Sequence, residues 1–241
     1  MSLSAIVIPA RMGSTRFPGK PLVDLCGKPM IQWVYERSVA SGVSDQVLVA
    51  TPDQEIIDAC LLFGAPAVLT RSDHPTGTDR IAEVAEKVVA DVYINVQGDE
   101  PLIDIETIKA VYEPFVDPSV RMASVFSQCP ETEVENPAVV KVVTDLAGNA
   151  LYFSRHAIPY PRSPRTTLVK KHIGIYAYRR DVLLEYPSWV QTPLELSESL
   201  EQLRFLENGV GIRMVEGQGS IISVDTPDQA DEVRKYLSFG A

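Results

Sequence analysis

The sequence predicts an α/β fold with a three-layer, mostly parallel central sheet and a small inserted subdomain. Short apolar runs alternate regularly with helical patterns over about the first 115 residues. Such alternation is typical of a parallel sheet covered by helices on both faces. After Pro118 the apolar runs follow one another with turn residues between them. This second pattern indicates antiparallel pairing and an insertion into the sheet.

The first predicted element is a buried strand at Ala5–Ile8, followed by a loop that breaks away at Pro9. The loop contains the glycines Gly13 and Gly19, and the cations Arg11, Arg16 and Lys20. A strand, a glycine-containing basic loop and a helix, in this order, are how α/β proteins bind phosphates. The loop matches neither G-x-G-x-x-G nor the P-loop pattern, so it predicts neither common site.

Charge favours an anion site over the alternative of a surface loop that happens to be basic. Residues 1–23 contain no acidic side chain, although the chain holds 32. Residues 11–28 contain four cations, where the composition predicts roughly 1.6. We therefore expect the loop to bind an anion.

The remaining elements follow from the same patterns. We expect helices over about 29–41, 53–64 and 77–88, and strands over 46–50, 67–70 and 92–96. Further strands are predicted at 122–128, 138–144, 150–154, 171–178, 211–215 and 221–224. Helices are predicted at 197–206 and 227–237.

The overall composition excludes several classes of protein. With 22 Lys and Arg against 32 Asp and Glu, the net charge of −10 argues against nucleic acid or an anionic membrane as a partner. Three scattered cysteines indicate neither a disulfide framework nor a zinc site. No apolar run approaches the length of a membrane span and no signal peptide is recognised, so we expect a cytoplasmic protein.

Two carboxylates follow predicted strands at the edge where open α/β sheets bind ligands. Asp99 comes after the strand at 92–96, and such a carboxylate beside a phosphate loop is suited to Mg²⁺. The alternative is a residue that only opens the next helix, whose expected cap is Asp104. Asp225 follows the predicted strand at 221–224, but it is equally suited to cap the helix that begins at Pro227.

The second half offers candidates for an acceptor site. Residues 146–180 contain seven cations and no acidic residue, and Arg155 and His172 border predicted strands there. They are candidates to bind the carboxylate of an acidic substrate, against the alternative of a solvated positive face. Glu198, Glu201 and Gln202 could bind a polyol or form a solvated helix face. The segment Thr76–Arg80 could hold a ribose or a base edge, or only cap a helix.

Seven stretches in register resemble the 3-deoxy-D-manno-octulosonate (KDO) cytidylyltransferases over nearly the whole chain. The stretches are I-P-A-R-M-G-S-T-R-F-P-G-K-P-L (8–22), G-K-P-M-I (27–31), N-V-Q-G-D-E-P (95–101), L-Y-F-S-R (151–155), H-I-G-I-Y-A-Y-R (172–179), L-E-Q-L-R (200–204) and V-D-T-P (224–227).

The resemblance implies transfer of CMP from CTP to the anomeric hydroxyl of KDO for lipopolysaccharide synthesis, with release of pyrophosphate. It implies catalytic roles for Lys20, Asp99 and Asp225, with Mg²⁺ on the two carboxylates. The nucleotide would contact Ala10, Arg11, Ser14, Lys20, Arg71, Thr78 and Gln97. KDO would contact Gln97, Arg155, His172, Glu201 and Gln202.

The resemblance also implies a nucleotide-diphospho-sugar transferase-like fold and a homodimer. The nucleotide-binding core would comprise residues 1–130 and 188–241, and residues 131–187 would form the sugar-binding and dimerisation subdomain. The segment between Arg155 and His172 is shorter than in many members, which leaves open an amino or other KDO analogue as the acceptor.

Other classes remain as alternatives. N-acylneuraminate cytidylyltransferases share I-P-A-R but diverge at T-R-F-P-G-K-P-L, and the sugar-1-phosphate nucleotidyltransferases have a different glycine spacing. A regulatory subunit that only binds a nucleotide would have no reason to keep both Asp99 and Asp225.

Overall fold

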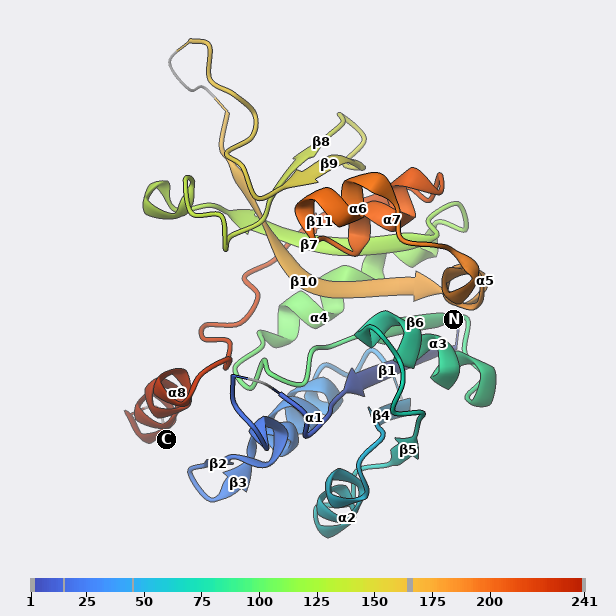
Figure 1. The fold of residues 1–241 in the computed structure, drawn as a ribbon, viewed down its shortest axis with the longest axis vertical. Helices are drawn as coiled ribbons and strands as arrows, with labels where there is room; N and C mark the ends of the chain where they lie inside the picture. The colour runs from blue at the N-terminus through green and yellow to red at the C-terminus, as the bar shows by residue number, and fades with distance from the viewer. Residues whose placement is uncertain (1–2, 15, 45, 164–166, 240–241) are drawn as a thin grey trace.

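One twisted sheet runs through the molecule in the strand order β11–β7–β10–β6–β1–β4–β5 (Figure 1). The computed structural model describes residues 3–14, 16–44, 46–163 and 167–239. Four parallel strands form one side of the sheet: β1 (Ser4–Pro9), β4 (Gln46–Thr51), β5 (Ala67–Leu69) and β6 (Val92–Asn95). β1 lies between β4 and β6 and pairs with both in parallel, as the alternating pattern predicts.

Helices cover both faces of this parallel half, which gives the predicted three layers. They are α1 (Met30–Ala40), α2 (Gln54–Leu62), α3 (Gly77–Lys87) and α4 (Ile105–Tyr112). Val7 packs with α3 on one face, whereas Ile6 and Ile8 pack with the other three helices on the opposite face. Side chains of β1 are thus buried on both faces, which explains its uninterrupted apolar run.

The second half of the sheet is mixed. β10 (Lys170–Arg179) is antiparallel to β6 on one side and to β7 (Met122–Gln128) on the other. β11 (Ile212–Glu216) pairs with β7 in parallel at the edge. β8 (Lys141–Thr144) and β9 (Ala150–Ser154) form a hairpin that joins β10 near its start. β10 is a central strand, so the sheet is continuous across the predicted domain boundaries at residues 131 and 187. The division into two domains stays a prediction.

Shorter elements complete the chain. The helices are α5 (Arg180–Glu185), α6 (Pro193–Glu198), α7 (Gln202–Glu207) and α8 (Pro227–Phe239). The 3₁₀ turns are η1 (Lys20–Leu22), η2 (Glu113–Val116), η3 (Glu131–Glu133) and η4 (Tyr186–Ser188). β2 (Asp24–Leu25) and β3 (Lys28–Pro29) form a separate small hairpin.

Three predicted elements need correction. The helix expected at 197–206 is two short helices, α6 and α7, because Ser199 between them adopts a left-handed conformation with φ 52°. Residues 221–224 form no strand. The one buried side chain among them, Val224, packs with α8, and the backbone N–H of Val224 donates to the carbonyl of Asp99. The strand expected from residue 138 begins at Lys141.

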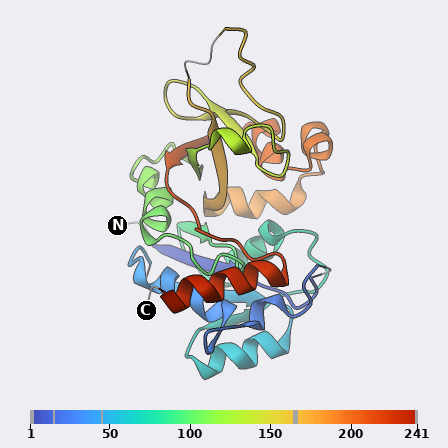
Figure 2. The same cartoon turned by 90° about the vertical axis from the view of Figure 1, so that its left-hand side faces the viewer.

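The C-terminal helix α8 lies beside β2 and the start of α1, so the end of the chain returns to residues near its beginning (Figure 2). Val224, Ala230 and Val233 form a small core with Leu25 and Met30. Arg234 also donates a hydrogen bond of 2.8 Å to the carbonyl of Asp24. These contacts bring residues near 225 against the basic loop of the N-terminus. Within the described ranges, no helix has the length and apolar character needed to cross a membrane.

Candidate active site

The basic loop after β1 is folded around one carbonyl group. The carbonyl of Met12 accepts hydrogen bonds from the N–H groups of Ser14 (2.9 Å) and Gly19 (3.1 Å). Gly19 has φ 72°, in the left-handed region that glycine adopts without steric cost, and it places Lys20 at the start of η1. The loop therefore doubles back, and Lys20 returns to the carboxyl ends of the strands.

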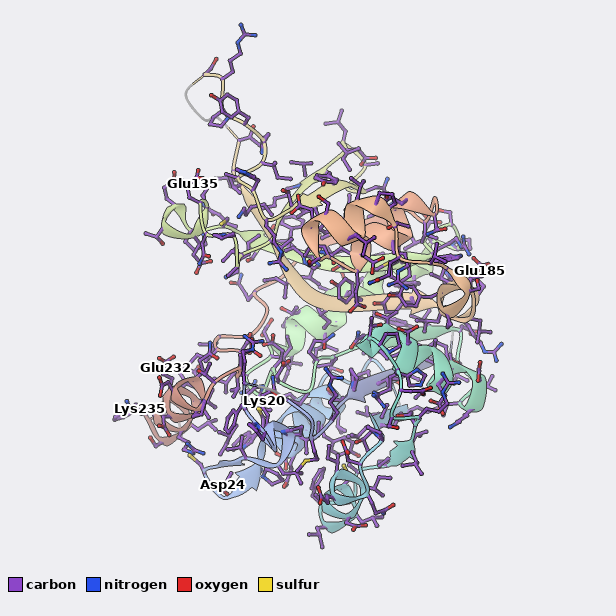
Figure 3. The ribbon with its side chains drawn as sticks, viewed as in Figure 1. Lys20, Asp24, Glu135, Glu185, Glu232 and Lys235 are labelled. Carbon is purple, nitrogen blue, oxygen red and sulfur yellow. The ribbon has the colours of Figure 1, made fainter. Side chains whose placement is uncertain are left out.

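Lys20 joins the two carboxylates singled out in the sequence. Its Nζ lies 2.8 Å from Asp99 Oδ2 and 3.1 Å from Asp225 Oδ1. Arg16 also contacts Asp225 at 3.1 Å. In Figure 3, Lys20 lies between helices α1 and α8, whereas Glu135 lies in the opposite half of the molecule. Three segments far apart in the chain thus meet at one charged cluster.

Gly98 allows this approach. A Cβ atom at residue 98 would lie 2.8 Å from the carbonyl oxygen of Pro9 and 3.4 Å from Ile31. The loops that follow β1 and β6 therefore touch through their backbones, and a side chain would separate them. This close contact sets Asp99 within reach of Lys20.

The cluster is electrostatically coupled. Burial alone would lower the pKa of Lys20, but the charges of Asp99 and Asp225 and their hydrogen bonds outweigh it and raise the pKa. Lys20 is therefore charged at neutral pH. Burial and the neighbouring Asp99 charge raise the pKa of Glu100 to about 7, although Ser223 donates to its carboxylate at 2.8 Å.

A cavity of about 360 Å³ opens over this cluster. The sequence-predicted residues that line it are Ala10, Arg11, Ser14, Lys20, Gln97, Asp99 and Asp225. The lining also includes the segment before and at the start of α3, among it His74, Thr76 and Arg80. The cavity thus combines a cluster of charged side chains with small and ring-bearing ones.

A second cavity of about 280 Å³ shares Gly77 and Gln97 with the first. Thr78, Glu201 and Gln202 line it as predicted, together with Asn95, Tyr176, Tyr178 and Phe205. Its polar groups are amides, hydroxyls and one carboxylate. Gln97 therefore stands where two hollows of different chemical character meet.

Glu201 and Gln202 occupy this second cavity because the chain turns at Ser199. Thr78 Oγ1 donates to Glu201 Oε2 at 3.0 Å, and burial raises the pKa of Glu201. Gln202 is 4 % exposed. Its Nε2 has no hydrogen-bond partner in the described part of the chain. A buried amide donor without a partner is costly, so this atom is suited to receive an oxygen acceptor from a ligand.

Three predicted site residues lie outside both linings. Arg71 is exposed and pairs with Asp73 at 3.1 Å. The guanidinium of Arg155 is held by backbone carbonyls, at 2.7 Å from Glu198, 3.1 Å from Pro137 and 3.3 Å from Ser199. Their substrate contacts remain predictions.

His172 is half-buried beside two aromatic rings. Its ring lies against Phe153 and Tyr176, and Nε2 is 2.9 Å from Ser124 Oγ. Burial lowers the pKa of His172 to about 3, so the imidazole is neutral at pH 7. A neutral ring can bind a carboxylate only as a hydrogen-bond donor, and its role as a ligand contact stays a prediction.

His74 lines the first cavity without having been singled out in the sequence, and Arg80 lines it as part of the segment Thr76–Arg80. His74 Nε2 lies 2.5 Å from Glu83 Oε2, and the same oxygen accepts the N–H of Arg71 at 2.9 Å. Arg80 donates to Thr70 and to the carbonyl of Arg71. The pattern Thr76–Arg80 marked this helix start, but no signal in the sequence marked His74.

The carboxylate pair is chemically suited to a magnesium ion. Mg²⁺ is commonly held by one or two carboxylates, with phosphate oxygens and water completing its coordination. Asp99 and Asp225 already contact one cation together, the ammonium group of Lys20. Among the residues described, no group of three or more acidic, histidine or cysteine side chains forms a complete metal cage. The pair therefore fits a metal shared with a phosphate ligand.

Comparisons with known proteins agree with this geometry. The cytidylyltransferase family model matches residues 5–214. The chain is 48% identical to a 3-deoxy-manno-octulosonate cytidylyltransferase of Trichlorobacter lovleyi, over 97% of this chain and 98% of that protein. It is 47% identical to the Escherichia coli protein of the same name, over 99% and 97% of the two chains. A solved structure of CMP:2-keto-3-deoxy-manno-octonic acid synthetase complexed with CTP superimposes with a TM-score of 0.97 at 45% identity, covering both chains completely.

Proposed function

Because the chain belongs to the cytidylyltransferase family, and within it to the 3-deoxy-manno-octulosonate cytidylyltransferases, we propose that it transfers CMP from CTP to the anomeric hydroxyl of KDO. Pyrophosphate is the second product. The observation that carries the proposal is the junction of two cavities at Gln97, one lined by cations and carboxylates and the other by neutral polar groups and Glu201.

The first cavity is suited to CTP. Arg11, Ser14 and Lys20 line it and would contact the phosphates. The part of the lining near Thr76 and Arg80 would bind the nucleoside. Attack on the α-phosphorus increases negative charge on the phosphate oxygens and on the departing pyrophosphate, so positioned cations stabilise the transition state more than the ground state.

Asp99 and Asp225 would hold Mg²⁺ in the loaded enzyme. When bound there, the metal supplies charge neutralisation at the phosphates and lowers the pKa of the attacking hydroxyl. Lys20 would exchange its two carboxylate partners for phosphate oxygens, because its flexible ammonium group lines the same cavity and can turn toward an anion there. Asp99 and Asp225 stay fixed by the contact of the two loops at Gly98 and by the Val224–Asp99 hydrogen bond.

The second cavity is suited to the sugar acid. Gln97, Glu201 and the Nε2 atom of Gln202, which has no partner among the described residues, offer hydrogen bonds to hydroxyl and carboxylate groups of KDO. Arg155 and His172 are not among the residues that line this cavity. Arg155 would contact KDO after its side chain leaves the backbone carbonyls that hold it, and His172 would contact KDO as a hydrogen-bond donor. Arg71 would reach the nucleotide only if it left Asp73.

The remaining parts of the proposal concern assembly and setting. We propose a homodimer formed through residues 131–187, because Leu146, Leu151, Tyr160 and Leu168 in this segment expose large apolar side chains. We place the enzyme in the cytoplasm, where CTP is available, and assign its product to lipopolysaccharide synthesis. Light scattering after size-exclusion chromatography tests the dimer.

One assay tests the reaction and the acceptor. Pyrophosphate release is measured from CTP and Mg²⁺ with KDO, an 8-amino KDO analogue or N-acetylneuraminate supplied in turn. Release with KDO at a kcat/KM well above the other two supports the proposal. Release with N-acetylneuraminate alone would show a different sugar specificity, and CTP binding with no release would show a regulatory nucleotide-binding protein.

A further inference from the structure

Asp53 occupies the position before α2 but does not cap that helix. In the sequence T-P-D before a helix, an aspartate is expected to accept hydrogen bonds from the first turn. Its side chain makes no such bond. Instead, Asp53 Oδ2 accepts the backbone N–H of Met12 at 2.7 Å, from a residue 41 positions earlier in the chain.

Met12 is the residue around which the basic loop folds. Its carbonyl holds Ser14 and Gly19, as described above, so its peptide groups connect both arms of the loop. The hydrogen bond to Asp53 therefore ties the central residue of the loop to the segment between β4 and α2. Through it, the carboxylate restrains Arg11 on one side and Ser14 on the other.

Asp53 also acts electrostatically on Arg80, a cation that lines the same cavity. Burial and the neighbouring charge of Arg11 lower the pKa of Arg80, whereas the charges of Asp53 and Glu83 act in the opposite direction. Arg11 and Arg80 both line the first cavity. The charge of Asp53 thus opposes the effect of Arg11 on Arg80, and this contribution is separate from the hydrogen bond to Met12.

We propose that Asp53 is a positioning residue for the triphosphate: its carboxylate anchors the Met12 N–H and thereby holds the basic loop in the shape that binds CTP. Asp53 is not among the residues that line the cavity, so its anchoring effect on the triphosphate would pass through the loop and not through direct contact. This inference rests on the proposed function, since it assigns the first cavity to CTP. It adds a residue from the segment between β4 and α2, 41 positions after Met12, to those that shape the site.

The experiment separates the hydrogen bond from the charge. Asp53→Asn keeps an oxygen acceptor for Met12 but removes the charge, whereas Asp53→Ala removes both. Asp58→Asn, on the exposed face of α2, makes the same charge change away from the loop; Asp58 accepts a hydrogen bond from Gln54 at 2.8 Å. CTP affinity is measured by calorimetry, and exchange of the Met12 amide by hydrogen–deuterium exchange without ligand.

We expect Asp53→Ala to weaken CTP binding about tenfold, as for the loss of one hydrogen bond to a charged group, and to speed Met12 exchange. Asp53→Asn should stay within about twofold of the wild type in both measurements. Asp58→Asn should match the wild type. If Asp53→Ala does not fold, Asp53→Glu, which moves the carboxylate by one methylene group, takes its place with the same expectation.

Two results would overturn the inference. One is a Met12 amide that exchanges equally slowly in Asp53→Ala and the wild type. The other is a loss of CTP affinity in Asp53→Asn as large as in Asp53→Ala, with Met12 still protected, because charge alone would then explain it. A wild-type protein that binds no CTP would refute the proposed function instead, while amide exchange would still test the anchor.

Discussion

Lys20 Nζ lies 2.8 Å from Asp99 Oδ2 and so connects residues 79 positions apart. The same nitrogen reaches Asp225, 205 positions away, at 3.1 Å. One ammonium group therefore balances two carboxylates that would otherwise repel each other across a partly buried site. This arrangement keeps the two acidic side chains together at one edge of the cavity.

The first prediction concerns this internal cation. Lys20→Met should lower CMP transfer by at least about a hundredfold, because a phosphate contact that stabilises the transition state is lost. It should also increase the affinity for Mn²⁺ in the absence of CTP, since the carboxylates no longer have Lys20 as a competing partner. Electron paramagnetic resonance measures free Mn²⁺ directly. Lys109→Met, on the surface of α4, is the control, and unchanged or weaker Mn²⁺ binding in Lys20→Met would contradict the prediction.

The second prediction concerns the contact of the two loops at Gly98. Gly98→Ala should cost about 1–3 kcal/mol in the free energy of unfolding, because its Cβ would lie 2.8 Å from a backbone oxygen that cannot move freely. It should also reduce kcat by separating Asp99 from Lys20. Urea denaturation and steady-state assays measure the two effects. Gly211→Ala, with no atom within 4 Å of its added Cβ, should change neither.

Much of the fold follows from local patterns in the sequence. The strands at 122–128 and 150–154 have the predicted bounds because their apolar runs are long and end at turn residues. The break at Ser199 could not be predicted, since neither glycine nor proline marks it and serine is held there by tertiary contacts. The apolar run at 221–224 resembles a strand, but the packing of α8 decides its conformation.

The candidate site was predictable to a similar degree. Asp99 follows a strand at the ligand-binding edge, and the charge pattern marked the loop that carries Lys20. Asp225 lies beside them although the strand expected before it is absent, because Val224 bonds directly to the Asp99 backbone. The contacts of Arg155 could not be read from the sequence: a long side chain at a strand end can reach a cavity or nearby carbonyls equally well.

The third prediction concerns the buried ion pair that joins α6 to α7, the helix whose Gln202 and Phe205 line the second cavity. Arg204 contacts Glu195 through two nitrogens at 2.7 and 2.5 Å, and both side chains are about 5 % exposed. Arg204→Met alone should cost about 3–5 kcal/mol, because it leaves a buried carboxylate without its partner. The double variant with Glu195→Leu should recover part of this loss, because Glu195 also accepts the N–H of Thr192 in the capping box of α6 and that bond is lost with it. Denaturant unfolding of all four proteins measures the coupling, and additive single effects would show that the pair is not coupled.

The fourth prediction concerns stability against pH. The pKa of His172 is about 3 in the folded protein and about 6.5 in an unfolded chain, so below pH 6.5 the unfolded state binds a proton that the folded state does not. The free energy of unfolding should therefore fall by about 1.4 kcal/mol per pH unit through this group between about pH 6.5 and 3, and be independent of it above pH 6.5. His172→Phe keeps a ring against Phe153 and removes the titration, so its stability should fall less steeply in this window. Urea midpoints at pH 8, 6, 5 and 4 measure the slope, with the exposed His156→Gln as control. Parallel curves for His172→Phe and the wild type would mean that water reaches the imidazole and that it titrates as in the unfolded chain.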